Sequence, residues 1–317
     1  MVVTGAFGYS GKYIARRLLA QGFRVRTLTA HPNRPHEFGS TVEVAPLDFE
    51  DRDQLIANLR GADCLFNTYW VRFDHGEATF DQAVANTKIL IEAAREAGIR
   101  KIVHLSITNP TLDSELPYFR GKAELEAFIR QSGLEYAILR PTVIFGLEDI
   151  LINNIAWFLR HFAVFGVPGS GDYCLQPIFV EDLANLAVAE ALQQGSRILD
   201  AVGPEIFTFR ELVSLIAARI GSRASLIHLP PTIALLASSI FGRILHDEVL
   251  TREEIKGLMA GLLISESQPT GATRFTDWLT RNADSLGREY ASELVRHYVP
   301  DSATSPAQIA AAHQEAT

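Results

Sequence analysis

The sequence predicts an α/β fold, in which a doubly wound parallel sheet is followed by a smaller, mostly helical carboxyl-terminal region. Three observations lead to this prediction. Short apolar runs alternate with helical stretches through the first half of the chain, as in parallel strands joined by crossover helices. A glycine-rich turn comes directly after the first apolar run. After Gly146 this alternation weakens, and helical patterns predominate.

The elements of the predicted sheet follow in order along the first half of the chain. Six expected strands, all short and rich in apolar or β-branched residues, are Met1–Thr4, Arg24–Thr29, Val42–Ala45, Cys64–Asn67, Lys101–Leu105 and Glu135–Leu139. The expected helices between them are Ser10–Gln21, a helix that begins at Asp51, Glu77–Ala97 and Tyr118–Gln131. Asp51 is a favourable N-cap with Gln54 three residues later, and Gly98 is suited to end a helix.

The second half of the chain predicts a return to the sheet and then a helical cap. Leu175–Val180 and Arg197–Ala201 are expected to be returning strands, on either side of a helix over Asp182–Gln193. Further helices are expected over Leu212–Ile220, Thr251–Gly261 and Ala283–His297. We therefore expect a first domain over residues 1–146 with returns at about 175–201, a cap region over 147–174 and 202–300, and a flexible tail over 301–317.

Composition indicates an ordinary globular protein and makes some partners improbable. Of 317 residues, 47% are hydrophobic and 21% are charged. The formal net charge of −8 argues against a broad nucleic-acid surface, which is usually basic. The two cysteines, Cys64 and Cys174, provide neither a metal-binding spacing nor a disulfide framework. We expect a cytoplasmic protein without a signal peptide and without a metal.

One apolar stretch, Thr232–Phe241, comes nearest to a membrane-spanning segment but is too short to cross a bilayer. A buried or interfacial helix explains it better, and contact with a membrane surface is the less favoured alternative.

Glycines at three-residue intervals connect the first strand to the first helix. The turn consists of Gly5, Ala6, Phe7, Gly8, Tyr9, Ser10 and Gly11. One glycine allows a tight turn, one allows backbone amides to approach a pyrophosphate, and one allows the helix to pack closely on the strand. The amino end of the helix favours negative charge. The turn therefore predicts a dinucleotide site.

The residues that follow the second strand favour NADP(H) over NAD(H). An NAD site usually carries an acid about 20 residues after the glycines, yet there is no Asp or Glu between Lys12 and His36. Instead, His31 and Arg34 lie where a 2′-phosphate would bind, although Arg34 in a solvated loop is an alternative.

Asp48 and Phe49 follow the third strand. The carboxylate of Asp48 is expected either to accept a hydrogen bond from the adenine amino group or to close a turn.

Tyr118 and Lys122 begin the helix after the fifth strand, and their i, i+4 spacing places both side chains on one face. A neighbouring ammonium lowers the pKa of a phenol and makes it a usable acid at neutral pH. Ser106 ends the fifth strand, at the sheet edge where ligands bind. Its hydroxyl is expected to contact a substrate carbonyl or to cap a loop.

Together these motifs resemble the extended short-chain dehydrogenase/reductase superfamily, whose fold is the Rossmann fold. The similarity is greatest to its atypical branch, with NmrA-like proteins and NDUFA9-like accessory subunits of respiratory complex I. It runs over about Met1–Ala201 and includes Asn86–Ala94, Arg140–Gly146 and Pro177–Ala184. The sequence departs from the branch at Ala30, where arginine is frequent, and its first strand is short.

The resemblance implies roles for individual residues. Tyr118 would exchange a proton with the reacting oxygen, Lys122 would hold the nicotinamide ribose, and Ser106 would orient the substrate. Cofactor contacts would also come from Asn67, Thr68, Tyr69, Asn86, Pro141, Thr142 and Val143.

Aromatic residues suggest an apolar substrate. Trp70 and Trp157 are expected to form walls of the site, and Arg72 to meet an acidic group, although such rings can equally be core.

We therefore expect an NAD(P)-dependent oxidoreductase that acts on a carbonyl or alcohol of a small molecule. The alternatives are a nucleotide-sugar epimerase or dehydratase and a non-catalytic dinucleotide sensor or assembly protein. A homodimer is possible.

Overall fold

The computed structural model describes residues 1–298, and in it the chain divides into two compact units. Unit 1 consists of Met1–Ile144, Ile178–Pro204 and Ser265–Thr273. Unit 2 consists of Phe145–Pro177, Glu205–Ile264 and the described residues from Arg274 onward. No helix among the described residues is long and apolar enough to cross a membrane.

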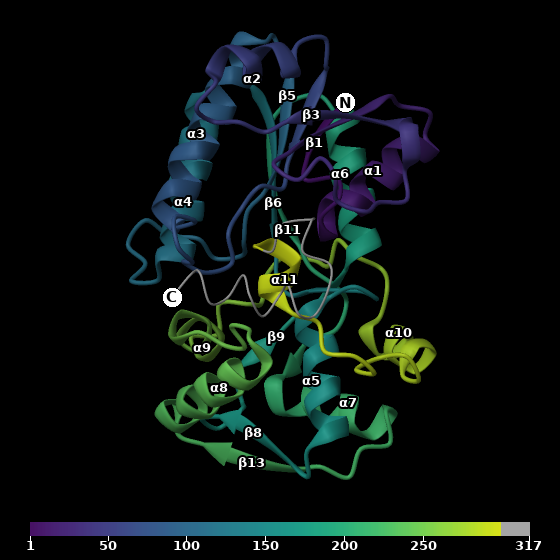
Figure 1. Cartoon of the computed structure of the whole chain (residues 1–317), viewed down its shortest axis with the longest axis vertical. Coiled ribbons are helices and arrows are strands. Elements are labelled where there is room, and N and C mark those ends of the chain that lie inside the picture. The colour runs from purple at the N-terminus through teal and green to yellow at the C-terminus, as the bar shows by residue number, and fades with distance from the viewer. Residues whose placement is uncertain (299–317) are drawn as a thin grey trace. The chain divides into compact units, whose positions relative to one another are not determined.

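Unit 1 is built on a seven-stranded sheet whose neighbouring strands are all parallel, in the order β11-β6-β5-β4-β1-β2-β3 (Figure 1). Its strands are β1 (Val2–Thr4), β2 (Val25–Thr29), β3 (Val42–Pro46), β4 (Cys64–Asn67), β5 (Lys101–Leu105), β6 (Glu135–Pro141) and β11 (Arg197–Ala201). The chain builds outward from β1 to β3 and then crosses to β4. The carboxyl ends of β1 and β4 therefore border the reversal of strand order, which is where ligands bind in such sheets.

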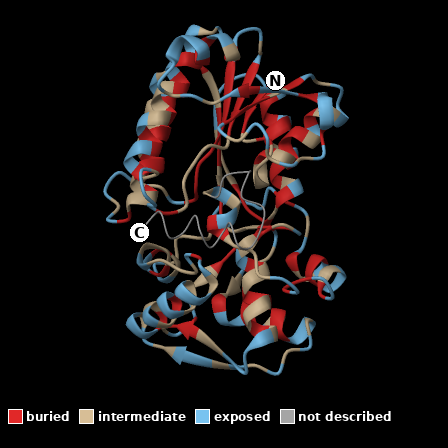
Figure 2. Ribbon diagram, in the orientation of Figure 1, coloured by how far each residue is buried: buried red, intermediate tan, exposed pale blue. Residues whose placement is uncertain are grey.

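Helices cover both faces of this sheet (Figure 1). The helices of unit 1 are α1 (Tyr9–Ala20), α2 (Arg52–Leu59), α3 (Phe80–Glu96), α4 (Pro117–Gln131) and α6 (Val180–Leu192), with a short 3-10 turn η1 (Gly39–Thr41). Helices α1 and α6 share one core with Val3 and Phe66, whereas α2, α3 and α4 share the other with Val2 and Leu65. The central strands β1, β4 and β5 are buried along their whole length, as the buried colouring of Figure 2 shows, and this explains their nearly continuous apolar runs.

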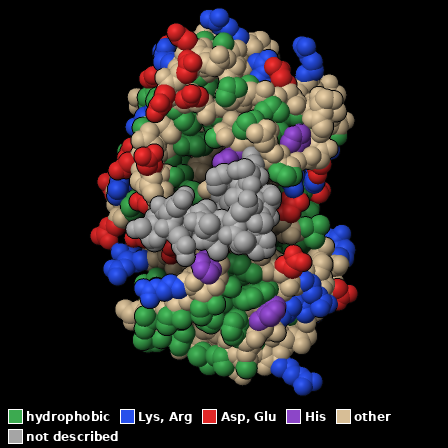
Figure 3. Space-filling view, in the orientation of Figure 1, with side chains coloured by type: hydrophobic (Ala, Val, Ile, Leu, Met, Phe, Trp, Pro, Cys, Tyr) green, Lys and Arg blue, Asp and Glu red, His purple; other side chains and the backbone are tan. Residues whose placement is uncertain are grey.

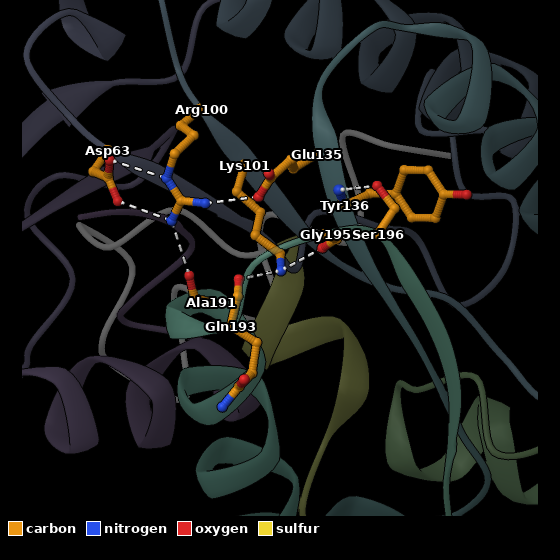
Figure 4. A network of polar contacts seen from close by, with 9 residues as sticks. All are labelled: Asp63, Arg100, Lys101, Glu135, Tyr136, Ala191, Gln193, Gly195 and Ser196. Carbon is orange, nitrogen blue, oxygen red and sulfur yellow. Dashed lines mark hydrogen bonds and ion pairs between the residues drawn. The ribbon is translucent and has the colours of Figure 1, made fainter.

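A polar network secures the amino-terminal ends of β5 and β6 (Figure 4). The guanidinium of Arg100 bonds to Asp63 and Glu135 and donates to the carbonyl of Ala191 at 3.2 Å. Lys101 is fully buried, and its Nζ donates to the carbonyls of Gln193 and Gly195, both at 2.9 Å. These carbonyls lie at the end of α6, where cations are favoured. The network therefore attaches α6 to the sheet.

Unit 2 is mostly helical with two small strand pairs. Its elements are α5 (Ile150–His161), β8 (Val164–Pro168), β9 (Cys174–Leu175), β12 (Phe207–Thr208), α7 (Phe209–Arg219), β13 (Ser225–Leu229), α8 (Pro231–Leu245), α9 (Arg252–Met259), α10 (Phe275–Asn282) and α11 (Glu293–His297). Strands β8 and β13 pair in parallel, and β9 and β12 pair antiparallel. The rings of Phe145, Phe275 and Trp278 pack with centroids 5.1 to 6.0 Å apart in its core.

Two expected elements differ from the structure. Leu175–Val180 does not return to the large sheet; it holds parts of β9 and of the two-residue strand β10 (Ile178–Phe179), which with β7 (Ile144–Phe145) stays outside it. The predicted helix Ala283–His297 is also wrong, because α10 ends before it and α11 covers only its last turn. Gly287 has a φ of 67°, and a Cβ there would lie 2.5 Å from the backbone of Ala156. The tail expected over 301–317 lies outside the described residues.

Candidate functional site

The glycine turn lies between β1 and α1. Gly5 has a φ of 65°, and its N–H donates to the carbonyl of Leu28 at 2.9 Å. A Cβ on Gly11 would lie 2.2 Å from the carbonyl oxygen of Gly5, so this approach requires glycine. Gly8 is the N-cap of α1, which has no side-chain cap and no acid in its first turn. The first amides of α1 are therefore suited to bind an anion.

The loop after β2 carries the predicted determinants of cofactor choice. The N–H of Arg34 donates to the carbonyl of His31, which keeps the two residues in one turn. The first acid of this loop, Glu37, pairs with Arg16 of α1, and this contact lowers the pKa of Glu37. The negative charge of Glu37 is thus balanced by a protein cation, which leaves the loop compatible with a phosphate.

Phe7, Tyr9 and Ser10 of the glycine turn are all partly exposed. The ring of Phe7 stacks on His36 with centroids 3.9 Å apart and planes 3° from parallel. This stack connects the glycine turn to the loop after β2.

The residue after β3 closes a turn. Asp48 Oδ1 accepts from the N–H of Glu50 at 2.9 Å, which is one of the two expected roles. The adenine contact of Asp48 stays a prediction. The ring of Phe49 lies 5.0 Å from that of Tyr69, so the ends of β3 and β4 are in contact.

Hydrogen bonds fix the segment that follows β4. Thr4 of β1 accepts from the N–H of Thr68 at 2.8 Å through Oγ1, and its carbonyl accepts from Thr68 Oγ1 at 2.6 Å. Asn67 is fully buried, and its Oδ1 accepts from the N–H of Tyr69. Asn86 of α3 donates to the Tyr69 hydroxyl at 3.0 Å. Tyr69 and Asn86 remain partly exposed, whereas the side chain of Asn67 is buried and forms its hydrogen bonds inside the protein.

The predicted Tyr118–Lys122 pair lies in the first two turns of α4. Tyr118 is partly exposed, with Lys122 Nζ 6.0 Å from its ring centroid. Lys122 is buried, donates to the carbonyl of Leu105 at 2.8 Å and lies 4.1 Å from the ring of Trp70. The Trp70 ring meets Tyr118 edge-on at 5.6 Å, and a Cβ on Gly121 would lie 3.1 Å from it. Trp70 therefore packs against both members of the pair.

The surroundings of Lys122 disfavour its charged form. Burial lowers the pKa of Lys122 to about 7, while the carboxylate of Glu126 acts in the opposite direction. His104 is also fully buried, and burial with the charge of Lys122 lowers its pKa well below the usual value. Its Nδ1 lies 3.0 Å from Asn67 Nδ2, and its Nε2 has no partner among the described residues. A lysine that titrates near neutrality next to a neutral histidine is typical of a functional site.

Ser106 is held by a glutamate one turn beyond Lys122. Ser106 Oγ donates to Glu126 Oε1 at 2.6 Å. The same carboxylate accepts from Arg140 through Nε at 2.9 Å and Nη2 at 2.5 Å. Glu126 is 3% exposed, so the carboxylate in its ion pair with Arg140 is shielded from water. Because its hydrogen is directed to Glu126, the Ser106 hydroxyl can act toward any further group only as a hydrogen-bond acceptor.

The segment after β6 supplies the remaining predicted cofactor residues. The carbonyl of Pro141 accepts from the N–H of Thr108, and that of Val143 accepts from Ile178 at 2.8 Å. Pro141 and Thr142 are buried, whereas Val143 is partly exposed. The segment is thus fixed at the carboxyl end of β6.

The predicted substrate residues fall in different units. Trp70 and Arg72 belong to unit 1, and the Arg72 guanidinium lies 5.7 Å from the ring of Phe73. Trp157 belongs to unit 2, where it stacks on His161 at 4.4 Å and meets Tyr290 edge-on at 5.2 Å. Within unit 1, the structure therefore connects Trp70 with the Tyr118–Lys122 pair.

Two residues of this arrangement were not among the predicted ones. Glu126 stands four residues after Lys122, and His104 stands two before Ser106. The i, i+4 spacing from Lys122 to Glu126 was a usable signal for Glu126. His104 lies inside an apolar strand, and no spacing distinguishes it from a core histidine.

Comparison with known proteins gives one family match and several relatives. The model of an NAD(P)H-binding family matches residues 5–148. The (4-alkanoyl-5-oxo-2,5-dihydrofuran-3-yl)methyl phosphate reductase of Streptomyces griseus is 30% identical over 70% of this chain and 74% of its own length. Subunit 9 of the mitochondrial NADH dehydrogenase [ubiquinone] 1 alpha subcomplex of Arabidopsis thaliana is 26% identical over 73% of this chain. The chain spans only 60% of that subunit's length.

Solved structures show the same fold at low sequence identity. The NADPH-dependent quinone oxidoreductase QOR2 of Escherichia coli, complexed with NADPH, superposes with a TM-score of 0.72 at 20% identity, over 90% of this chain and 99% of that one. A nucleoside-diphosphate-sugar epimerase of Staphylococcus aureus superposes with a TM-score of 0.66 at 15% identity, over 92% and 97%.

Proposed function

The chain belongs to the extended, NmrA-like branch of the short-chain dehydrogenase/reductase superfamily, and on this basis we propose that it is an NADP(H)-dependent oxidoreductase. Its substrate is a carbonyl or alcohol on a small, fairly apolar molecule. The Tyr118–Lys122 pair carries this proposal, because it places a phenol beside a buried ammonium at the carboxyl end of β5.

The residues present fit a nicotinamide dinucleotide. A side chain at Gly11 would collide with the carbonyl oxygen of Gly5, so the tight glycine turn needs glycine at this position. The amino end of α1 has no side-chain cap and is therefore suited to bind a pyrophosphate. When bound, the dinucleotide supplies or accepts the hydride at the substrate carbon. By the superfamily resemblance, Lys122 and the Pro141–Val143 segment would hold its nicotinamide end.

Tyr118 is the proton donor in the reductive direction. Its hydroxyl gives a proton to the oxygen of the carbonyl as the alcohol forms. The phenolate that remains favours the charged form of Lys122, which in turn stabilises it. The Ser106 lone pairs can accept a hydrogen bond from the alcohol form.

Trp70 forms the apolar wall of this site. Its ring packs on Tyr118 and Lys122 and helps to shield Lys122 from water. Its indole Nε1 is buried without an acceptor among the described residues, which suits a substrate oxygen or nitrogen.

The substitution Tyr118→Phe tests the chemistry. With NADPH and a panel of apolar aldehydes, ketones and quinones, it should lower turnover at least about a hundred-fold. NADPH affinity should stay unchanged, because the phenyl ring preserves packing on Trp70. Tyr136→Phe is the matched control, because the Tyr136 hydroxyl forms no hydrogen bond with a described residue, whereas its backbone N–H does. Equal turnover in wild type and Tyr118→Phe would contradict the proposed role.

Arg34→Gln tests the cofactor preference. Loss of one charge-assisted hydrogen bond to a 2′-phosphate should weaken NADPH binding about ten-fold and leave NADH binding unchanged. Calorimetric titration measures both, with the exposed Arg24→Gln as control. Equal affinity of the wild type for the two dinucleotides would refute the preference.

A second candidate function is dinucleotide binding without turnover. The deep burial of Lys122 under Trp70 favours it, and so does the similarity to accessory subunits of NADH dehydrogenase. Tight NADPH binding with no turnover on the panel, unchanged in Tyr118→Phe, would select this candidate over the reductase.

A further inference from the structure

Unit 2 contains a groove of about 600 Å³ that no part of the proposed function uses. It is lined by the end of α5 and the residues after it, the segment before β13, and the loop at residues 287–288. All of its lining residues belong to unit 2, whereas the glycine turn and the Tyr118–Lys122 pair belong to unit 1.

Positive charge is concentrated in this groove. Arg160, Arg223 and Arg288 come from its three segments, and His161 adds an imidazole. None of the three arginines forms an ion pair with a carboxylate in the described part of the chain. Eight other arginines do: Arg16, Arg26, Arg52, Arg100, Arg140, Arg197, Arg210 and Arg274. The groove therefore brings together three guanidiniums that no carboxylate of the described residues neutralises.

A structural role accounts for only one of these arginines. Arg160 is partly buried and donates to the carbonyls of Ala283 at 2.7 Å and Leu286 at 2.9 Å, so it caps the end of α10. Arg288 uses only its Nε, toward the carbonyl of Asp284 at 2.7 Å. The exposed Arg223 makes no side-chain hydrogen bond to any described residue. The Nη groups of Arg288 and the whole guanidinium of Arg223 thus remain for another partner.

The arginines also act on one another. Burial lowers the pKa of Arg160, the charge of Arg288 adds to this effect, and Asp284 opposes it. A bound anion would be attracted by the summed positive charge of these side chains.

We infer that this groove binds a phosphate-bearing anion through Arg223 and Arg288, with Arg160 fixed behind them. Guanidinium groups match phosphate oxygens in paired hydrogen bonds, and two or three of them neutralise a dianion. Phe162, which is 37% exposed, also lines the groove and can cover an apolar part of the ligand.

The phosphate could belong to a soluble molecule or to a lipid headgroup. Phe162 packs on Phe241 of α8 at 5.0 Å. That helix exposes Ile233, Leu236, Ile240 and Ile244, and Figure 3 shows hydrophobic side chains gathered over α8. The test therefore includes both sources.

The experiment compares wild type with Arg223→Gln/Arg288→Gln. Inorganic phosphate is titrated in chloride buffer by calorimetry, and co-sedimentation is measured with phosphatidylcholine vesicles with and without phosphatidic acid. Arg210→Gln/Arg252→Gln is the control, because it removes the same charge from exposed sites of unit 2 outside both the groove and α8. The groove variant should bind phosphate at least about ten-fold more weakly, and the control should match wild type.

The two sources give different results. Co-sedimentation with phosphatidic acid vesicles that is lost only in the groove variant identifies a lipid headgroup, whereas phosphate binding without co-sedimentation identifies a soluble ligand. Equal weakening in both double variants, or no binding of either probe by the wild type, would overturn the inference.

Discussion

Two buried lysines lie at opposite ends of β5 and differ in how fully their ammonium groups are hydrogen-bonded. Lys101 and Lys122 are 0% and 2% exposed, and burial lowers the pKa of both. Lys101 Nζ donates to two carbonyls at the end of α6 (Figure 4), whereas Lys122 Nζ donates to one carbonyl and otherwise meets an aromatic ring. A lysine whose donors are largely satisfied holds the fold. One whose charge is poorly compensated remains responsive to a ligand.

Replacing each lysine by methionine should distinguish these two situations. The largest expected effect is on turnover in Lys122→Met. Lys122→Met should lower turnover at least about a hundred-fold, because the phenolate of Tyr118 loses its neighbouring charge. Its stability should change little, because a buried charge is removed together with its desolvation cost. Steady-state kinetics and thermal unfolding measure the two effects.

Lys101→Met should give the reverse pattern. It should cost about 1–3 kcal/mol of unfolding free energy, since two carbonyls lose a charged donor, and turnover per folded molecule should persist. If both variants lost stability equally while turnover changed in neither, the contrast between the two lysines would be wrong.

Glu126→Gln sharpens the same contrast at the functional end. Its amide would face the Arg140 guanidinium, and breaking this largely buried pair should cost about 3 kcal/mol. Glu135→Gln is the matched control, because its pair with Arg100 is exposed and should cost at most about 1 kcal/mol. Urea unfolding of both variants measures the difference, and similar losses would show that burial of Glu126 is energetically unimportant.

The pH dependence of stability tests the surroundings of Lys122 independently of any substitution at other residues. The pKa of Lys122 is about 7 in the folded protein and near the ordinary lysine value when unfolded. Between these values the unfolded state binds more protons, so stability attributable to Lys122 should rise as pH increases above about 7. The stability difference between wild type and Lys122→Met, followed from pH 7 to about 10, should shift in favour of wild type. A constant difference would mean that Lys122 keeps its ordinary pKa.

The sequence was sufficient to predict the sheet because short apolar runs alternate with helical stretches, and its central strands are buried on both faces. Cys64–Asn67, Lys101–Leu105 and Arg197–Ala201 were predicted with the bounds that the structure has. The glycine turn and the Tyr118–Lys122 pair were equally predictable, because local spacing alone determines them.

Other features depend on contacts between distant segments. The break at Gly287 follows from its approach to Ala156, and the position of Trp70 over Lys122 joins the segment after β4 to α4. Neither leaves a periodic pattern in the chain. The Glu126–Arg140 pair likewise links helix α4 to strand β6, and it depends on how these two elements pack in three dimensions.

Calorimetric titration of the intact chain with NADPH tests the central claim most directly. The account predicts saturable binding that Lys122→Met weakens and Lys101→Met does not, because only Lys122 lies at the ligand-binding edge of the sheet. Absence of binding at millimolar NADPH and NADH, in protein shown to be folded by circular dichroism, would contradict it.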